Sequence, residues 1–199
     1  AKFRAARRLW ARLLKERYGA KNPRSLTFRT GAGSGGSTLV AQQPENNVVR
    51  VTLHTVIAAM AGVQSMHTAS MDEAHALPSE EAATLALRTQ QIVAYESGLA
   101  DVIDPLGGSY YVENLTDQIE EQAEEYLKRI EERGGMVLAI ESGWVVQEIG
   151  EEAYRFQREV ERGERVVVGL NRFTTDETPP YHRSRTSWIP GGYRLNLMD

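Results

Sequence analysis

The sequence predicts an α/β protein, namely the last βα units of a larger barrel followed by a helical segment. Two short apolar stretches, each followed by a loop and an amphipathic helical pattern, alternate over residues 1–98. Such βα alternation is typical of a parallel sheet whose strands are buried by helices. Because two strands do not make a stable parallel sheet alone, we interpret these residues as part of a larger barrel.

The composition narrows the class of protein. The 199 residues are 41% hydrophobic and 25% charged, as in a globular domain. No apolar run approaches the roughly 18–20 residues that cross a bilayer, so we expect no membrane segment. The absence of cysteine excludes disulfides, thiolate metal sites and cysteine nucleophiles, and it agrees with a cytoplasmic location. The net charge of -4 argues against a nucleic-acid-binding protein.

Residues 1–18 predict the first helix, because apolar side chains recur at helical spacing and Gly19 follows as a stop. Basic residues surround this apolar stripe, and they fit either a phosphate-binding surface or a solvated helix face. The chain opens at Ala1 inside the helical pattern, without a starting Met, so we expect a fragment or a processed product. The apolar positions are Phe3, Ala6, Leu9, Trp10, Leu13 and Leu14.

The first βα unit follows this helix. Residues 25–30 predict a short buried strand that leads into the Gly-rich turn 31–37. Pro44 suits the first turn of the next helix, where its missing N–H costs nothing, and Gly62 ends that helix.

The second βα unit has the same order of signals. Residues 63–68 predict the second strand, and Ser79, after Pro78, is a good N-cap for a helix that ends before Gly98. We therefore assign residues 1–103 to the C-terminal part of the barrel.

Beyond residue 103 the pattern becomes helical. Residues 115–130 predict an amphipathic helix with a strongly acidic outer face, and residues 136–142 and 146–162 predict two more helices. Residues 166–170 predict one late strand. We assign residues 104–178 to a helical segment after the barrel.

The end of the chain has a different character. Residues 179–199 contain Tyr, His, Arg, Ser, Trp, Pro and Gly without any period. We therefore expect residues 179–199 to form an irregular tail.

Nine strings go beyond general patterning. They are residues 1–12 (AKFRAARRLWAR), 41–48 (AQQPENNV), 64–68 (QSMHT), 71–78 (MDEAHALP), 88–91 (RTQQ), 96–98 (ESG), 104–112 (DPLGGSYYV), 131–135 (EERGG) and 167–173 (VVGLNRF). In this order they closely resemble the methylmalonyl-CoA mutase family, which includes isobutyryl-CoA and 2-hydroxyisobutyryl-CoA mutases. The resemblance covers about residues 1–178.

The resemblance implies a TIM-type (β/α)8 barrel that threads the CoA arm along its axis and an adenosylcobalamin cofactor that caps it. The cofactor would supply the radical for rearranging the carbon skeleton of an acyl-CoA. The chain would correspond to the last two barrel strands and the helical segment behind them. Catalytic residues would lie upstream, and the cobalamin domain downstream or on a separate small subunit. We therefore expect no catalytic residue here, inactivity in isolation, and assembly into a homo- or hetero-oligomer.

Cobalt ligation is expected elsewhere for the same reason. The family's cobalt-binding histidine stands in a DxHxxG motif, and none of the four histidines of this chain does. We assign no metal ligand to His54, His67, His75 or His182.

By resemblance, three residues are expected to contact CoA: Arg29, Gly31 and Gly33. A guanidinium at position 29 suits the CoA phosphates, although a surface ion pair is the alternative. Gly31 and Gly33 depart from the family pattern, roughly HxQTxG, because they replace its His and Gln. This departure fits a different acyl group, a bulkier substrate or lost activity.

Five residues are expected to contact the cofactor: Gln64, His67, Gln90, Glu96 and Glu113. Gln64 and His67 would lie at the C-terminal end of the second strand, although His67 equally fits a hydrogen-bonded core histidine. The other three suit hydroxyl contacts with the adenosyl ribose, and a salt bridge or a helix cap is the alternative for each.

Two further functions remain open. The first is a non-catalytic helical interaction module, which would dock through the acidic helix 115–132 and the basic first helix. The second is a phosphate-binding protein built around residues 31–37, whose backbone N–H groups could face an anion. That run matches neither the Rossmann nor the Walker spacing, so we rank this function last.

Overall fold

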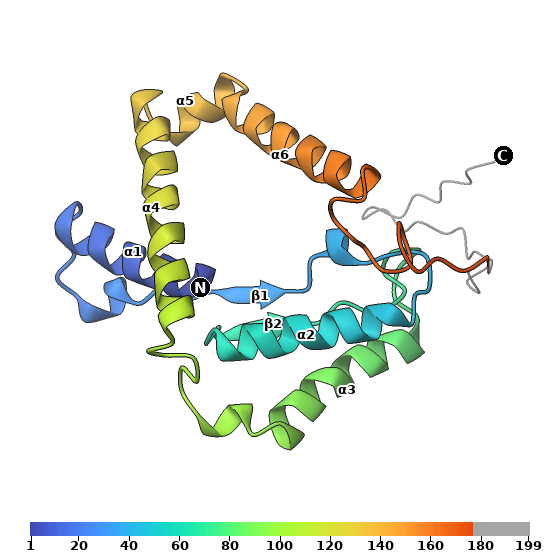
Figure 1. Ribbon diagram of the computed structural model, residues 1–199. Helices are drawn as coiled ribbons and strands as arrows, with labels where there is room; N and C mark the ends of the chain where they lie inside the picture. Colours follow the sequence, from blue (N-terminus) through green and yellow to red (C-terminus); the bar gives the residue numbers. More distant parts are fainter. Residues whose placement is uncertain (177–199) are drawn as a thin grey trace, which may run out of the picture. The chain divides into compact units, whose positions relative to one another are not determined.

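The computed structural model describes residues 1–176 of the chain (Figure 1). Its contacts divide the chain into two units, each described separately below. Unit 1 contains residues 1–30 and 104–167, and unit 2 contains residues 31–103 and resumes at residue 168. The predicted irregular tail, residues 179–199, lies outside the described residues, and so does His182.

Unit 1 is helical, as the sequence predicts for most of it. It contains α1 (Lys2–Glu16), the 3-10 turn η1 (Pro23–Leu26), α4 (Tyr110–Glu132), α5 (Met136–Glu141) and α6 (Trp144–Glu161). Ser109 caps α4 by accepting a hydrogen bond from the Val112 N–H at 3.5 Å. Gly134 follows the end of α4 with a φ of 86°, a left-handed conformation that favours glycine.

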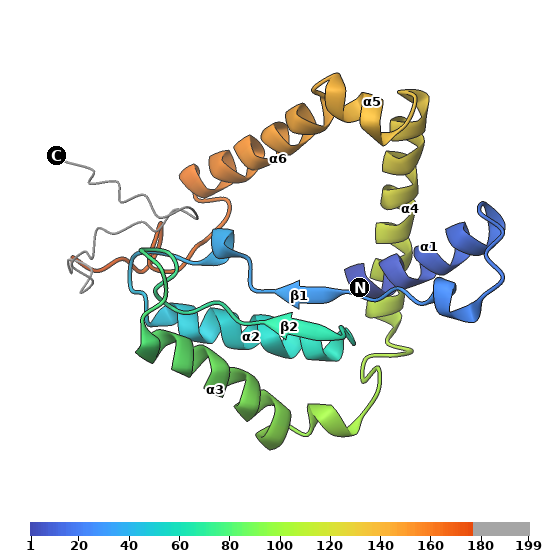
Figure 2. The same cartoon turned by 180° about the vertical axis from the view of Figure 1, so that it is seen from behind.

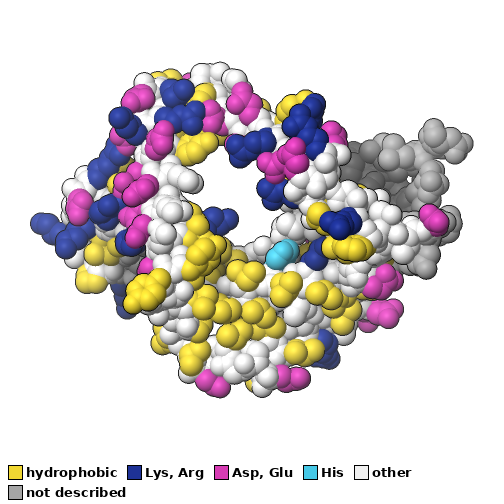
Figure 3. Space-filling model, in the orientation of Figure 1, with side chains coloured by type: hydrophobic (Ala, Val, Ile, Leu, Met, Phe, Trp, Pro, Cys, Tyr) yellow, Lys and Arg dark blue, Asp and Glu magenta, His cyan; other side chains and the backbone are white. Residues whose placement is uncertain are grey.

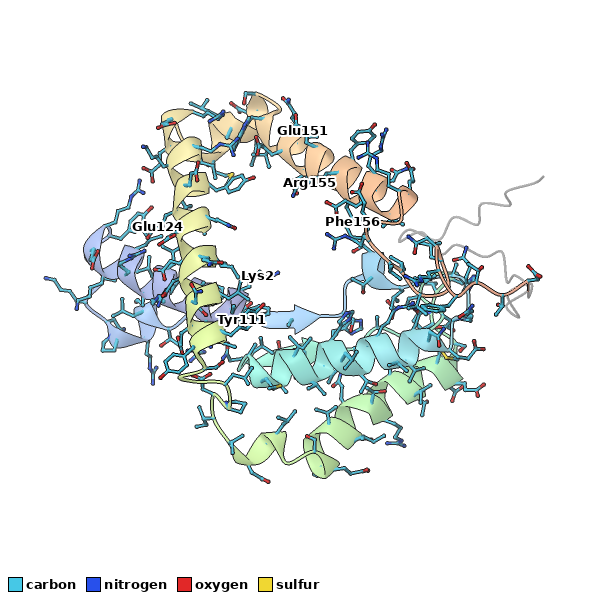
Figure 4. The ribbon with its side chains drawn as sticks, viewed as in Figure 1. Lys2, Tyr111, Glu124, Glu151, Arg155 and Phe156 are labelled. Atoms are coloured by element: carbon cyan, nitrogen blue, oxygen red, sulfur yellow. The ribbon has the colours of Figure 1, made fainter. Side chains whose placement is uncertain are left out.

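Helices α1 and α4 pack through a row of ion pairs. The basic partners are Arg4, Arg8, Arg12 and Arg17 of α1 and its C-cap, and the acidic partners are Asp104, Glu113, Asp117, Glu120, Glu124 and Glu131. Figure 4 labels Glu124 on the α1 side of α4. The small residues Ala5 and Thr116, each 2% exposed, let the two helices approach closely. The basic face of α1 is therefore bound to the acidic face of α4.

Unit 2 contains the parallel strands. Its elements are β1 (Gly31–Gly33), the 3-10 turn η2 (Gly36–Thr38), α2 (Asn46–Met60), β2 (Ser65–His67), α3 (Glu80–Glu96) and the 3-10 turn η3 (Leu99–Asp101). The register pairs Gly31 with Ser65 and Gly33 with His67. Seen from behind, α2 again runs alongside the two strands (Figure 2). The βα alternation and the parallel pair confirm the α/β class, and the barrel stays a prediction.

Two predicted strands are wrong. Residues 25–30 contain the end of η1 and an irregular stretch, and the strand begins only at Gly31. The Asn22 side chain accepts a hydrogen bond from the Arg24 N–H at 3.0 Å, and Pro23 stands at the first position of the turn. This local cap outweighs the strand propensity of the following residues.

The late strand 166–170 is also absent from the described residues, which have only an isolated bridge between Val168 and Arg172 at this place. Gly169 has a φ of 81°, so the chain turns back where the apolar run predicted extension.

The core of unit 2 is small. Leu39, Val51 and Ala69 form its buried cluster. Apolar residues along α2 remain exposed, and Figure 3 shows hydrophobic side chains gathered over α2 and α3. They include Val49, Leu53 and Ile57, which are 57–62% exposed. No helix within residues 1–176 is long and apolar enough to cross a membrane.

Candidate functional site

Both strands of unit 2 end at the same edge because they run in parallel. At this edge the loop after β1 lies beside the loop after β2, and the Ser34 N–H donates to the His67 carbonyl at 3.0 Å. In parallel α/β proteins, ligands bind outside the carboxyl ends of the strands. We therefore take this edge as the candidate site.

One face of the strand pair is open. Gly31 and Gly33 of β1 and their register partners Ser65 and His67 of β2 are exposed, whereas the residues between them are half-buried. A Cβ at position 33 would lie 3.7 Å from the His67 Cβ, an ordinary contact, but one at position 31 would lie 2.7 Å from the Ser65 Oγ. Ser65 thus fills the space beside Gly31, and the imidazole of His67 flanks Gly33.

Asn47, on the first turn of α2, ties the two loops together. Its side chain is completely buried. Its Nδ2 donates to the Val40 carbonyl at 2.8 Å and the Met71 carbonyl at 2.9 Å, and its Oδ1 accepts from the Val40 N–H at 3.1 Å. Val40 lies in the loop after β1 and Met71 in the loop after β2, so one side chain fixes both.

The loop after β2 is also held by its own acidic residues. The Glu73 carboxylate accepts from the Ser70 N–H at 2.6 Å, and the Asp72 Oδ2 accepts from the Ser79 N–H at 2.9 Å. His75 Nε2 lies 2.8 Å from the Ala41 carbonyl oxygen of the other loop.

Sequence reasoning assigned no role to Asn47 or to these loop residues. The signal was present, because Asn47 lies in the string AQQPENNV and Asp72, Glu73 and His75 lie in MDEAHALP. These distinctive strings contain the residues that shape the site's edge.

The predicted CoA-contacting residues lie close together in the chain. Gly31 and Gly33 form the open face of β1, and Arg29 is exposed in the irregular stretch that precedes it. Their contacts with CoA stay predictions.

The predicted cofactor residues divide into three groups. His67 ends β2, and Gln64 stands just before it, where its Nε2 donates to the Gly62 carbonyl at 3.0 Å. Gln90 is half-buried within α3, and Glu96 is exposed at its last position. Glu113 belongs to unit 1.

Glu113 has a structural task in the first turn of α4. Its carboxylate accepts from the Gly108 N–H at 2.9 Å and pairs with Arg4. The hydrogen bond from Gly108, followed by the Arg4 guanidinium, holds the pKa of Glu113 below its usual value. This arrangement matches the salt-bridge and helix-cap alternative, and a contact with the adenosyl ribose stays a prediction.

The edge of the strand pair offers groups that can contact a ligand. Residues 1–176 contain no group of three or more His, Cys, Asp or Glu that could hold a metal ion. The histidines of unit 2 have different surroundings: His75 contacts a loop carbonyl, His54 is half-buried in α2, and His67 is exposed at the edge of the strand pair. An exposed imidazole and bare strand backbone can contact and orient a ligand.

Comparison with known proteins gives matches over nearly the whole chain. Residues 1–187 match the family model described as methylmalonyl-CoA mutase. The chain is 49% identical over 177 residues to the 2-hydroxyisobutanoyl-CoA mutase large subunit of Aquincola tertiaricarbonis, which covers 89% of the chain and 32% of that protein. It is 44% identical over 176 residues to methylmalonyl-CoA mutase of Escherichia coli, which covers 88% of the chain and 24% of that protein.

A third relative shows the same proportions. The methylmalonyl-CoA mutase large subunit of Propionibacterium freudenreichii is 42% identical over 180 residues, which cover 90% of the chain and 25% of that protein. The chain thus spans about a quarter to a third of the length of these curated relatives. The match over nearly its whole length shows that the chain belongs to the methylmalonyl-CoA mutase family.

Proposed function

We propose that the chain is the C-terminal barrel part of an acyl-CoA mutase large subunit. We also propose that the exposed face of β1 and β2, together with the loops at their carboxyl ends, contributes to its CoA thioester site. The observation that supports this most directly is the strand register. It places Gly31 and Gly33 of β1 and the polar side chains of β2 on one exposed face, and the pair Gly33 and His67 stands at the carboxyl ends of the strands, where α/β proteins bind ligands. Bare strand backbone lets a ligand approach closely.

The proposed residue roles follow the same geometry. Gly31 and Gly33 would border the thioester, and Arg29 would meet the CoA phosphates. Gln64 and His67 would face the cofactor, whereas Gln90, Glu96 and Glu113 are the proposed contacts of its adenosyl ribose. No residue of the chain is proposed as catalytic.

The proposed cofactor is adenosylcobalamin, which supplies the radical that starts the rearrangement when bound. Exposed His67 and the bare backbone of Gly33 beside it would form one border of such a site. We propose that the cobalt-binding residues lie outside this chain. The chain's own task would be to orient the thioester and to shield it from water.

The proposed partners are a cobalamin-binding domain or small subunit and further mutase chains. Two relatives are named as large subunits, which supports a partner subunit. The exposed apolar side chains of α2 support an oligomer, since such faces are usually covered. Neither nucleic acid nor a membrane is a proposed partner, and the cytoplasmic location stays a prediction from the lack of cysteine.

Calorimetric titration of the purified chain with isobutyryl-CoA tests this proposal. We expect binding with a dissociation constant below about 1 mM, weaker binding of free CoA, and no heat from inorganic phosphate. Gly33→Leu should block binding by filling the open face beside His67. Gly150→Leu, at an exposed glycine of α6 with open space for a side chain, is the matched control and should bind like the wild type.

Two outcomes would contradict the proposal. Absence of isobutyryl-CoA binding at millimolar concentration would remove its basis, and phosphate binding of equal strength would favour the phosphate-binding alternative. The chain alone, supplied with adenosylcobalamin, should not rearrange an acyl-CoA. Robust turnover would show that the chain is not an incomplete part.

The interaction module is the second candidate function. The two docking faces expected for it, on α1 and α4, are joined to each other by ion pairs. A different surface supports the interaction module. Helix α6 contains no buried residue, and its Val146 and Ile149 are 70% and 65% exposed. Solution size separates the candidates: an incomplete barrel should self-associate, whereas an evolved module could be monomeric.

A further inference from the structure

A polar network at the start of α2 reaches beyond the two loops of the candidate site. Arg50, one turn after Asn47, donates through Nη1 to the Asn47 Oδ1 at 2.8 Å and through Nη2 to the Val168 carbonyl at 2.6 Å. Gln43 donates through Nε2 to the Phe173 carbonyl at 2.9 Å and contacts the Thr175 Oγ1 at 3.3 Å. The segment 168–175 is thus joined to the same turn of α2 that holds the site loops, and Figure 1 shows it beside that turn.

Backbone strain is concentrated at this contact. Of the three non-glycine residues with positive φ among residues 1–176, two are Gln43 at 51° and Phe173 at 56°. Each such conformation is unfavourable for a residue with a Cβ, and it persists when the surroundings determine it. The hydrogen bond from the Gln43 side chain to the Phe173 carbonyl joins these two strained positions directly.

The fit around Gly169 is equally specific. Gly169 is buried, and its φ is 81°. A Cβ at this position would lie 3.1 Å from the Gln43 Oε1, closer than an ordinary contact. The same Oε1 accepts from the Asn46 Nδ2 at 2.9 Å, so the Gln43 side chain is held from both sides.

The Arg50 guanidinium is partly withdrawn from water, and this desolvation lowers its pKa. Its two described hydrogen bonds go to Asn47 and to Val168. Its planar fork spans the two acceptors, which a lysine cannot do. Arg50 therefore connects the loop-binding amide to the segment 168–175.

We propose that Gln43, Asn47 and Arg50 are positioning residues that couple the segment 168–175 to the ligand-binding loops after β1 and β2. Asn47 fixes the loops to each other, and Arg50 and Gln43 transmit their arrangement to the segment. The ligand half of this inference rests on the proposed function, with an acyl-CoA as the ligand. The structural half rests on the hydrogen bonds alone.

Coupling of this kind is reciprocal. If a ligand stabilises the loop arrangement that Asn47 holds, it must also stabilise the docked segment 168–175, and the docked segment must strengthen ligand binding by the same factor. A typical coupling of this kind is about 5- to 150-fold in affinity. The segment should therefore become less dynamic when the loops bind a thioester.

Hydrogen exchange of the full chain, followed by mass spectrometry with and without isobutyryl-CoA, tests this inference. The main variant is Gln43→Asn, because asparagine tolerates positive φ but is one methylene too short to reach Phe173. Without ligand, we expect peptides covering residues 168–175 to exchange about tenfold faster in this variant. Gln42→Asn, the same change at the exposed neighbouring residue, should leave their exchange unchanged.

The ligand arm separates positioning from a purely structural role. At equal site occupancy, isobutyryl-CoA should slow exchange of residues 168–175 in the wild type but not in Gln43→Asn. Arg50→Lys, which keeps the charge but loses the fork, should weaken the same response.

Unchanged exchange in Gln43→Asn without ligand would overturn the structural half. Equal protection of the segment in the wild type and in Gln43→Asn would overturn the coupling. If the wild type binds no isobutyryl-CoA, the proposed function fails together with the ligand half, whereas the comparison without ligand still decides the structural half.

Discussion

The ion pair network between α1 and α4 predicts a clear ranking of stability effects. Glu120 is its central carboxylate: its side chain is 7% exposed and pairs with Arg8 and, at 2.8 Å, with Arg12. Glu120→Gln keeps the shape and an acceptor but removes the charge. A charge-assisted hydrogen bond contributes about 1 kcal/mol more than a neutral one, so two such bonds amount to about 2 kcal/mol.

Partial exposure limits the effect. The guanidinium groups of Arg8 and Arg12 are 47% and 40% exposed and have further partners in Asp117 and Glu124. Their charges can be solvated after the substitution, so the larger loss expected for a fully buried pair does not apply. A loss of about 2 kcal/mol corresponds to a fall of roughly 4–8 °C in the thermal midpoint of a chain of this size.

The assay is thermal unfolding followed by circular dichroism at 222 nm. Glu121→Gln, at an exposed position on the same helix, is the matched control and should shift the midpoint by about 1 °C or less. Asp117→Asn, at the exposed end of the network, should fall between the two, since exposed pairs contribute about 0–1 kcal/mol. Equal shifts for Glu120→Gln and Glu121→Gln would refute the reasoning.

Two further predictions concern pH and the glycines of β1. The pKa of Glu113 is lowered in the folded chain, so its stabilising contribution is complete above the unfolded pKa of about 4.3 and is lost as the pH falls through the folded value. The thermal midpoint should therefore fall more steeply with acidification below about pH 4.3 in the wild type than in Glu113→Gln, and parallel curves would contradict this. Gly33→Ala should stabilise the chain by about 0.5 kcal/mol because a Cβ fits there, whereas Gly31→Ala should not, since Ser65 occupies its space. Adding Ser65→Ala should recover about 1 kcal/mol for Gly31→Ala in urea unfolding, and an additive double mutant would contradict the clash.

Local chemistry made the helix ends predictable from the sequence. Ser79 caps α3 as expected, because its Oγ accepts from the Ala82 N–H at 3.2 Å within a single turn. Gly134 follows the end of α4 because a helix commonly ends in a left-handed residue, and glycine adopts this conformation without help from distant residues. The parallel strand pair followed from the order of βα signals, although its first strand lies six residues later than expected.

Contacts between distant residues were not predictable from periodicity. The Arg4 and Glu113 pair joins positions 109 residues apart, and each residue alone resembles any charged surface residue. The same holds for the role of Asn47: the string AQQPENNV marks its position, but helical periodicity does not show that its amide holds two loops. Glu113, which directly follows the string DPLGGSYYV, was expected near the cofactor by resemblance, but resemblance does not separate structural residues from ligand contacts.

Photoaffinity labelling of the purified chain with a benzophenone-bearing CoA thioester tests the central claim most directly. If the open edge of β1 and β2 binds the thioester, the labelled peptides will contain residues 31–41 or 64–76, and excess isobutyryl-CoA will prevent labelling. Labelling confined to α4, α5 or α6, or labelling that isobutyryl-CoA does not reduce, would contradict the assignment of this edge as the site.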